Sequence, residues 1–278
     1  AMDTVIVTGG AGFIGSHLVR ALLRAGARVR VLDDFSTGRR ENLSGLGPRV
    51  DLVEGSLTDR RALTAALSGV DHVLHQAAIP SVPRSIDNPA ASHAANVEGT
   101  LQLLLAARQA GTRRLVYASS SSVYGDPPTL PVVETFPTNP LSPYAVQKLA
   151  AEQYFRVFHR VYGMETVCLR YFNVFGPRQD PHSTYAAVIP RLIATALHGR
   201  PFTVNGDGHQ SRDFTYVDNV VQANLLALVA PDAPGRVFNA ACGNSISLNQ
   251  IIAAIGSLCG RDLPVSYGPP RTGDIRHS

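Results

Sequence analysis

Lysine is almost absent from this 278-residue sequence. Of its 25 lysine and arginine residues, only Lys148 is a lysine. Cysteine is also scarce: Cys168, Cys242 and Cys259 are odd in number and far apart, which argues against a disulfide framework or a zinc site. No apolar run approaches the roughly 20 residues that cross a bilayer. No signal sequence precedes the first expected strand, so we expect a cytoplasmic protein with no membrane partner.

Charge and histidine patterns exclude two further classes of partner. The net charge of +4 is spread along the chain instead of forming a basic face, so we expect no nucleic-acid partner. The same charge suits an anionic small substrate. The nine histidines lack metal-ligand spacing, since His72 and His75 lie three apart on an expected strand and face opposite ways. We therefore expect no metal.

Apolar strand-like runs alternate with helical patterns along the first two thirds of the chain. The expected strands cover 4–9, 28–33, 50–55, 72–78, 113–119 and 166–172, and the expected helices cover 13–25, 97–110 and 143–161. The apolar residues of the strands are continuous rather than alternating, which indicates strands buried on both faces. The sequence therefore predicts an α/β protein with a Rossmann-type, doubly wound parallel sheet.

The last third of the chain has a different character. Glycine and proline become frequent after 173, and only short helical patterns remain, near 185–198, 218–229 and 247–259. We expect a smaller C-terminal α/β portion that binds the substrate, formed by 173–212 and 242–278. The first domain then covers 1–172, with a later segment near 213–241 returning to it.

A glycine-rich turn joins the first strand to the first helix. Gly9, Gly12 and Gly15 stand at three-residue spacing, where glycine permits a tight turn and a close approach of pyrophosphate to the helix N-terminus. The second strand ends in Asp33, whose carboxylate can accept hydrogen bonds from an adenosine ribose. A carboxylate there favours NAD over NADP, although Arg39 lies nearby and can soften that preference.

The lone lysine stands four residues after a tyrosine on an expected helix. Tyr144 and Lys148 therefore share one helix face. A cation beside the phenol is expected to lower its pKa from about 10, towards a value useful for proton transfer. Arginine does not replace lysine there, because its guanidinium is a planar fork and not a compact ammonium. The alternative is a surface lysine that follows a tyrosine by coincidence.

These motifs, with the serine run Ser119 to Ser122, resemble an extended short-chain dehydrogenase/reductase from Thr4 to Ser278. Longer stretches resemble UDP-hexose 4-epimerases, in particular bacterial enzymes acting on UDP-N-acetylglucosamine. They are HQAAIPSVPRS at 75–85, SSSSVYGD at 119–126, LSPYAVQKLAAE at 141–152, LRYFNVFGPRQDP at 169–181 and NGDGHQSRDF at 205–214. The resemblance implies a chain some tens of residues longer than the one printed.

The resemblance implies a catalytic role for four residues. Tyr144 removes the proton of the sugar 4-hydroxyl while hydride passes from C4 to NAD⁺, and Lys148 lowers the phenol pKa and holds the nicotinamide ribose. Ser120 relays the proton, with Ser121 as the alternative. The 4-keto sugar then turns over and receives the hydride on its other face.

The resemblance also implies the residues that bind the two ligands. The cofactor set is Gly9, Gly12, Phe13, Ile14, Gly15, Asp33, Ser56, Leu57, Gln76, Ala77, Ala78, Tyr144 and Lys148. The substrate set is Pro80, Ser121, Ser122, Asn173, Ala187, Val188, Leu192, Thr203, Val204, Arg212, Arg271, Asp274 and Ser278. In that set Asn173, Arg212 and Arg271 bind the diphosphate, and Asp274 binds the uridine ribose. Val188 and Leu192 lie near the uracil, and Thr203 and Val204 contact it through their backbone.

Several positions bear on which reaction and which sugar are expected. Ser121 and Ser122 stand where related dehydratases carry an Asp-Glu pair, which argues against dehydration. Ser278 stands where a bulky tyrosine excludes N-acetylated sugars in this family, so we expect a pocket that admits them. Pro80 replaces a glycine common in the relatives and stiffens the loop beside the sugar, which leaves the preferred sugar open. Ser56 replaces an aspartate that contacts adenine, and its hydroxyl accepts that bond more weakly.

Two other readings of the function stay open at this point. One is a UDP-glucuronate 4-epimerase, and the other is a non-catalytic NAD-sensing or RNA-binding protein of the same fold. The resemblance also implies a homodimer, joined through a bundle of the helices expected at 97–110 and 143–161.

Overall fold

Seven parallel strands form the central sheet of the computed structural model, which describes residues 3–183, 186–270 and 276–278. Their spatial order is β11-β6-β5-β4-β1-β2-β3. They are β1 (Thr4–Thr8), β2 (Arg28–Asp33), β3 (Val50–Glu54), β4 (His72–His75), β5 (Arg114–Ser120), β6 (Glu165–Tyr171) and β11 (Val237–Ala240). The order reverses between β1 and β4, and in such sheets a ligand crevice opens at the carboxyl ends of the strands on either side of this point. The doubly wound fold expected from the sequence is confirmed.

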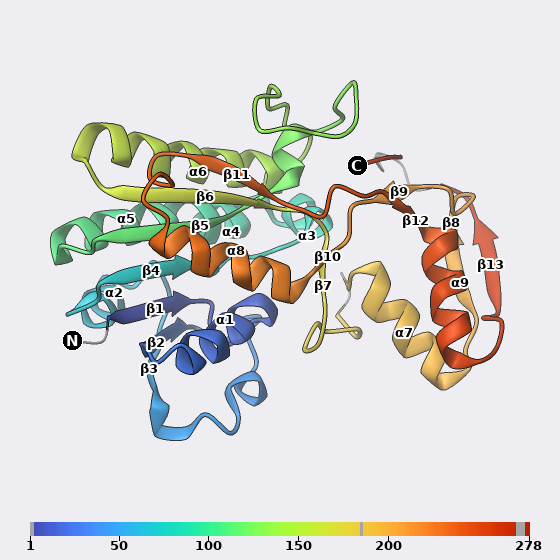
Figure 1. The fold of residues 1–278 in the computed structure, drawn as a ribbon, viewed down its shortest axis with the longest axis horizontal. Helices are drawn as coiled ribbons and strands as arrows, with labels where there is room; N and C mark the ends of the chain where they lie inside the picture. Colours follow the sequence, from blue (N-terminus) through green and yellow to red (C-terminus); the bar gives the residue numbers. More distant parts are fainter. Residues whose placement is uncertain (1–2, 184–185, 271–275) are drawn as a thin grey trace.

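Helices cover both faces of this sheet (Figure 1). The first face carries α1 (Phe13–Arg24) and α8 (Val217–Val229), and the second carries α2 (Arg60–Leu67), α5 (Gly99–Ala110) and α6 (Pro143–Tyr162). Leu18 and Val220 enter the first core, and Leu103 and Phe155 enter the second; all four are fully buried. The inner strands are thus enclosed on both sides, as their continuous apolar runs predict, whereas the edge strand β3 is largely exposed, with Leu52 at 41%.

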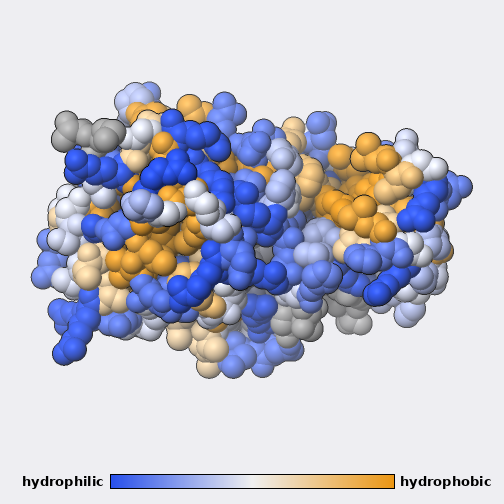
Figure 2. Space-filling view, turned by 90° about the horizontal axis from the view of Figure 1, so that it is seen from below, coloured by the Kyte–Doolittle hydropathy of each residue, from blue (hydrophilic) through white to orange (hydrophobic). Residues whose placement is uncertain are grey.

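A smaller group of elements lies beyond the carboxyl ends of the strands, on the right of Figure 1. It comprises α7 (Val188–His198), α9 (Leu248–Cys259) and the parallel pair β8 (Phe202–Asn205) and β13 (Val265–Gly268). Its core includes Leu192 and Val204, which are both 0% exposed. Apolar side chains also gather on its outer surface over α7 (Figure 2), where Ile193 and Leu197 are exposed.

Short strand pairs connect the two groups. They are β7 (Val174–Phe175) with β10 (Thr215–Tyr216), and β9 (Ser211–Arg212) with β12 (Ile246–Ser247). The remaining helices are α3 (Val82–Asp87) and α4 (Pro89–His93), which continue through a π-helical turn at Ala94–Glu98 into α5. Within the described residues, no helix is both long and apolar enough to cross a membrane.

Three local features differ from the sequence-based expectations. The helix α2 was not expected, although Asp59 caps its N-terminus by accepting from the amides of Arg61 and Ala62. The strand expected at 72–78 ends at His75, because the chain leaves the sheet at Gln76 and enters the wall of the ligand cavity. The pair formed by β8 and β13 was also not expected.

Candidate active site

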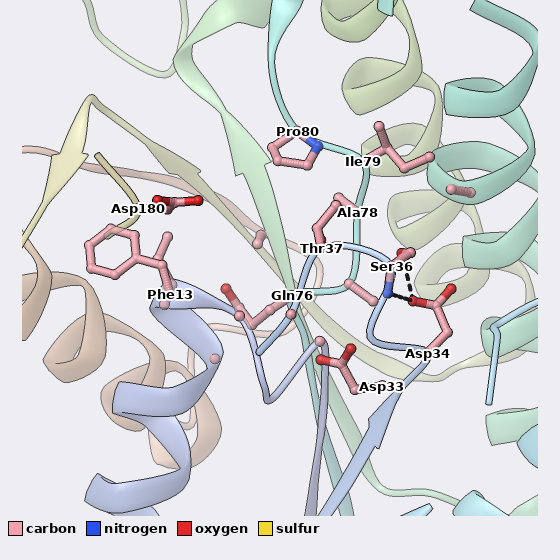
Figure 3. Close-up of a pocket in the computed structure, with 18 of the residues that line it drawn as sticks. Phe13, Asp33, Asp34, Ser36, Thr37, Gln76, Ala78, Ile79, Pro80 and Asp180 are labelled. Carbon is pink, nitrogen blue, oxygen red and sulfur yellow. Dashed lines mark hydrogen bonds between the residues drawn. The ribbon is translucent and has the colours of Figure 1, made fainter. Parts of the chain in front are cut away.

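A cavity of about 930 Å³ opens at the carboxyl ends of β1, β2, β4 and β5, at the point where the strand order reverses. Its walls come from the turn after β1, the loop after β2, the segment 76–80 after β4, the end of β5 and the start of α6. Phe13, Asp33, Gln76 and Pro80 line it from these separate elements, and Asp180 reaches it from the far side (Figure 3). The cavity thus joins parts of the chain that are distant in sequence.

The glycine turn leaves room for an anion at the start of α1. Gly9 has φ +68°, and a Cβ on it would lie 2.7 Å from the backbone nitrogen of Ala77. A Cβ on Gly15 would lie 2.1 Å from the carbonyl oxygen of Gly9. Gly12 caps α1 without a side-chain hydrogen bond, and the first turn carries no acidic residue. Its free amides and the helix dipole therefore suit a pyrophosphate, and the turn fits a dinucleotide such as NAD.

Asp33 ends β2 at the edge of this turn, and its carboxylate is fixed by the backbone. One oxygen accepts the amide of Ala11 and the other accepts the amide of Phe35, both at 2.9 Å. Burial raises the pKa of Asp33, and the two amide bonds oppose that rise. Each oxygen keeps a free lone pair for a further donor, such as a ribose hydroxyl. The carboxylate therefore lies where the sequence predicts it.

Tyr144, Lys148 and Ser120 meet at the other end of the cavity. The ammonium of Lys148 donates to the carbonyl oxygen of Ala118 at 2.7 Å and lies 5.8 Å from the centre of the Tyr144 ring. Ser120 lies within hydrogen-bonding reach of the phenol of Tyr144 and lowers its pKa. Ser122 donates to the Ser120 oxygen through its amide at 3.2 Å and its hydroxyl at 2.9 Å. The Ser120 hydrogen is therefore available to the phenol.

The expectation that the pKa of Tyr144 is lowered beside Lys148 is wrong for the protein without bound ligands. Burial raises the pKa of Tyr144 to about 12, and the hydrogen bond from Ser120 only partly offsets this. Burial also lowers the pKa of Lys148 to about 7, so at neutral pH the amine carries only part of a positive charge. Desolvation penalises the charged form of each group, and it is the largest cause of both shifts.

Sixteen of the residues expected from the sequence line this one cavity. They are Gly9, Gly12, Phe13, Ile14, Gly15, Asp33, Ser56, Leu57, Gln76, Ala77, Ala78, Pro80, Ser120, Tyr144, Lys148 and Asn173. The whole expected cofactor set is among them. Ser121 and Ser122 do not line it, because the chain turns away from the cavity after Ser120 into a 3₁₀ turn. The structure thus distinguishes Ser120 from its neighbours as the serine that contacts Tyr144.

Most of the expected substrate residues lie outside this cavity, in or near the smaller group of elements. They are Ala187, Val188, Leu192, Thr203, Val204, Arg212 and Ser278. The side chains of Leu192 and Val204 are enclosed in the core of that group, which leaves only backbone atoms for a ligand contact. Arg212 donates to the carbonyl oxygens of Ser211 and Arg276. Arg271 and Asp274 lie outside the described residues.

The loop after β7 lines the cavity and was not assigned a role from the sequence. Arg178 donates from Nε to the Ser16 hydroxyl at 2.9 Å, with φ +67° at its backbone. Asp180 pairs with Arg39 at 2.6 Å, and the His17 ring is bonded to the carbonyl oxygen of Pro177. The motif GPRQDP was visible in the sequence, but only the fold shows that it closes over α1.

Within the described ranges, no cluster of histidine, cysteine, aspartate or glutamate is arranged to hold a metal.

Comparison with known proteins agrees with this geometry. The profile described as "NAD dependent epimerase/dehydratase family" matches residues 5–241. The UDP-glucose 4-epimerase of Mycolicibacterium smegmatis is 41% identical over 98% of this chain and 88% of its own length. The structure of UDP-N-acetylglucosamine 4-epimerase from Methanobrevibacter ruminantium M1, in complex with UDP-N-acetylmuramic acid, aligns with a TM-score of 0.95 at 41% identity. It covers 100% of this chain and 89% of that chain.

A third comparison includes the cofactor. The UDP-glucuronic acid 4-epimerase of Bacillus cereus, in complex with UDP-glucuronic acid and NAD, aligns with a TM-score of 0.90 at 33% identity. The alignment covers 99% of this chain and 89% of that chain. Since the family profile covers most of the sequence and the relatives match along nearly all of it, this chain belongs to the NAD-dependent epimerase/dehydratase family.

Proposed function

We propose that this protein interconverts the 4-epimers of UDP-N-acetylhexosamines, and possesses the same activity on plain UDP-hexoses. The coarser function, NAD-dependent 4-epimerisation of a UDP-sugar, is supported by the family and by the relatives at 41% identity. The observation that carries the proposal is the meeting of Tyr144, Ser120 and Lys148 in the same cavity as the glycine turn. A proton acceptor and a dinucleotide site are thereby placed side by side.

The chain's own residues handle the proton of the sugar 4-hydroxyl. Ser120 holds that hydroxyl and relays its proton to Tyr144, and the C4–H bond breaks as the C4 carbonyl forms. The chemistry that NAD supplies when bound is acceptance of hydride from C4 and its return to the other face of the ring. On return, Tyr144 gives the proton back to O4. No proton or electron is lost over the cycle, so the reaction needs no further reactant.

Lys148 keeps the proton of Tyr144 mobile. In the cavity the amine is half-protonated near pH 7, because burial lowers its pKa to about 7. The phenol must lose its proton before it can accept one, and a positive charge on Lys148 favours that loss. In this proposal the same ammonium would also donate to ribose hydroxyls of NAD, and its bond to the carbonyl oxygen of Ala118 holds it in the cavity wall.

The preference for N-acetylated sugars rests on residues at the edge of the smaller group of elements. Ser278 is bound to β9 through its amide to the Ser211 carbonyl oxygen at 3.1 Å, and its carbonyl oxygen accepts the amide of Asp213 at 2.9 Å. A small side chain at this position leaves space that a tyrosine would fill.

A second candidate is 4-epimerisation of UDP-glucuronate. It is favoured by the similarity to the Bacillus cereus enzyme, which binds UDP-glucuronic acid. Arg84 lines the same cavity as Pro80. The homodimer and the cytoplasmic location expected from the sequence belong to the main proposal and are independent of the choice of sugar.

The test is direct assay of the purified protein with three substrates supplied separately: UDP-N-acetylglucosamine, UDP-glucose and UDP-glucuronate. We expect the 4-epimer of the first to form fastest, that of the second more slowly, and none from the third. Fastest conversion of UDP-glucuronate would establish the second candidate instead. Absence of conversion of all three would reject the epimerase proposal.

The variant Tyr144→Phe tests whether the phenol takes part in the reaction. It removes only the hydroxyl, so we expect the fold and the bound NAD to be retained while kcat falls by roughly 1,000-fold, as for loss of a general base. NAD is quantified by its absorbance after denaturation of the protein. Activity near the wild-type value would exclude Tyr144 as the proton acceptor.

A further inference from the structure

A fully buried ion pair lies behind the cavity, and the proposed mechanism does not use it. Glu152 of α6 is 0% exposed and Arg170 of β6 is 4% exposed. The guanidinium donates to the carboxylate from Nη2 to Oε1 at 2.6 Å and from Nε to Oε2 at 3.0 Å. In the described part of the chain, Nη1 of Arg170 is buried without a hydrogen-bond partner. Taking two charges out of water is costly, so stability alone does not account for this pair.

The carboxylate joins three elements at one point. Ser119 of β5 donates its hydroxyl hydrogen to Oε2 of Glu152 at 2.8 Å. Ser119 and Arg170 are register partners in the β5–β6 pair, so their side chains point to the same face of the sheet. Glu152 therefore ties α6 to both strands at the level of the cavity floor, where Ser119 is one of the lining residues.

The same face of α6 carries the two expected catalytic groups. Tyr144, Lys148 and Glu152 stand at four-residue intervals, one per turn of the helix. Each contacts the end of β5: Tyr144 is bonded to Ser120, Lys148 to the carbonyl oxygen of Ala118, and Glu152 to Ser119. Three consecutive residues of the strand thus meet three successive turns of the helix.

We propose that Glu152, held by Arg170, is a positioning residue that fixes the rotation and height of α6 on β5, and so aligns Tyr144 and Lys148 with Ser120. The inference rests on the roles proposed above for those three residues. Glu152 acts through the helix and the strand, since its contacts are with Ser119 and Arg170 and it does not line the cavity. Loss of its charge leaves α6 free to rotate by a small angle, and a small misplacement lowers the rate of chemistry more than it weakens binding.

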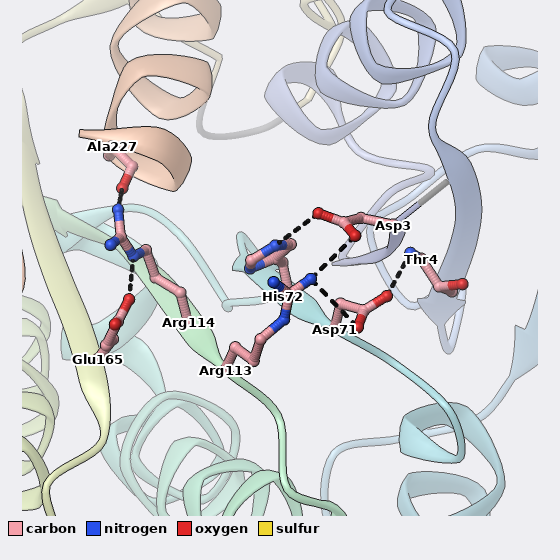
Figure 4. Close-up of polar contacts among 8 residues, drawn as sticks. All are labelled: Asp3, Thr4, Asp71, His72, Arg113, Arg114, Glu165 and Ala227. Atoms are coloured by element: carbon pink, nitrogen blue, oxygen red, sulfur yellow. Dashed lines mark hydrogen bonds and ion pairs between the residues drawn. The ribbon is translucent and has the colours of Figure 1, made fainter. Parts of the chain in front are cut away.

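The chain offers a matched control at the opposite end of the same two strands. Arg114 of β5 and Glu165 of β6 are register partners and form an ion pair at 2.6 Å. Figure 4 shows this pair, with Arg114 also donating to the carbonyl oxygen of Ala227. Arg114 is buried, but neither partner lines the cavity. Loss of this pair removes a charge between the same strands without touching the face of α6 that carries Tyr144.

The lone lysine supplies a readout that does not depend on turnover. Lysine labelled with ¹³C at Cε gives one side-chain resonance from this sequence, because Lys148 is its only lysine. In the wild-type protein we expect that resonance to be sharp and to titrate with a midpoint near 7. In Glu152→Gln we expect it to broaden or divide, and in Glu165→Gln we expect it to match the wild type.

Steady-state kinetics of the same three proteins complete the test. For Glu152→Gln we expect kcat to fall on the order of 100-fold, with KM for the UDP-sugar changed by no more than about twofold. For Glu165→Gln we expect both constants to be unchanged. A Glu152→Gln protein with the wild-type lysine resonance and the wild-type kcat would overturn the proposal.

A double variant covers the case in which a single uncompensated charge prevents folding. Glu152→Gln combined with Arg170→Gln removes both charges and keeps the side-chain size similar, so we expect a folded protein with the same altered lysine resonance and reduced kcat. Full activity in this variant would also overturn the proposal. If the wild-type protein converts no UDP-sugar, the proposed function fails, whereas the lysine resonance still tests the alignment of α6.

Discussion

At the scale of single residues, the chemistry of the site is decided by burial. The sequence indicates Tyr144 and Lys148 as a pair, and the structure confirms that both line one cavity with Ser120. The sequence predicts the wrong direction for the pKa change of Tyr144, because the change depends on how much water the folded chain removes from the phenol. Burial raises that pKa to about 12 and lowers the pKa of Lys148 to about 7.

The buried amine of Lys148 makes a pH-dependent contribution to stability. Its pKa is about 7 in the folded state and 10.5 as a free side chain. Between these values the unfolded chain binds the proton and the folded chain releases it, so stability from this group rises with pH. The full cost of holding a buried ammonium is present below pH 7, and it is lost above pH 10.5.

Replacement of that amine is therefore expected to stabilise the fold. For Lys148→Met, freed of cofactor, we expect Tm at pH 6 to rise by roughly 4 °C, as for about 2 kcal/mol. The difference from the wild type shrinks as the pH rises towards 10. Differential scanning calorimetry of both proteins across this range checks the effect. A stabilisation that is constant with pH would show that the amine is not desolvated in the folded state.

At the scale of elements, the turn between β1 and α1 follows from the sequence almost completely. Glycine spacing, a strand before it and a helix after it are all readable, and Asp33 lies at the expected edge. The loop at 176–183 is different: its contacts with His17 and Ser16 join positions about 160 residues apart. Local patterns carry no information on such pairings, and the helix α2 and the pair β8–β13 were missed because their patterns are short.

The tightness of the turn can be tested with one added methyl group. In Gly15→Ala the new Cβ would meet the backbone oxygen of Gly9 at 2.1 Å, so the turn must open. We expect NAD affinity to fall by at least roughly tenfold, since the amides of the first turn no longer converge on the pyrophosphate. Isothermal titration with NAD after removal of bound cofactor measures the change.

A glycine in the smaller group of elements serves as the control for that substitution. A Cβ on Gly268 of β13 would make an ordinary contact of 3.6 Å with the Thr203 side chain. We expect Gly268→Ala to bind NAD as the wild type does. Equal affinity in Gly15→Ala and the wild type would mean that the cofactor does not use the glycine turn.

At the scale of the whole molecule, one face of α6 is apolar and exposed. Val146, Tyr154, Val157 and Val161 lie between 37% and 62% exposed and recur at helical spacing along one stripe. Leu105 of α5 is exposed as well, at 42%. An apolar stripe of this kind is typical of a protein–protein contact, and it supports the homodimer that the sequence predicts through these two helices.

Charge placed on that stripe is expected to separate the subunits. For Val157→Glu combined with Val161→Glu, we expect the molar mass measured by light scattering after gel filtration to fall from that of a dimer to that of a monomer. Leu197→Glu on α7, where Leu197 is 73% exposed, is expected to leave the mass unchanged. If Leu197→Glu gives a monomer and the double variant stays a dimer, the interface lies on the smaller group of elements instead. A wild-type protein with the mass of a monomer would reject the dimer.

The single lysine also has a consequence for chemical reactivity. Reagents that acylate side-chain amines have one target in this sequence, and that target is 4% exposed in the wall of the cavity. An amine with a pKa near 7 is a good nucleophile at neutral pH, whereas ordinary lysines are mostly protonated there. Acylation of Lys148 is therefore selective, and occupants of the cavity protect it. The rate of acylation reports directly on access to the site.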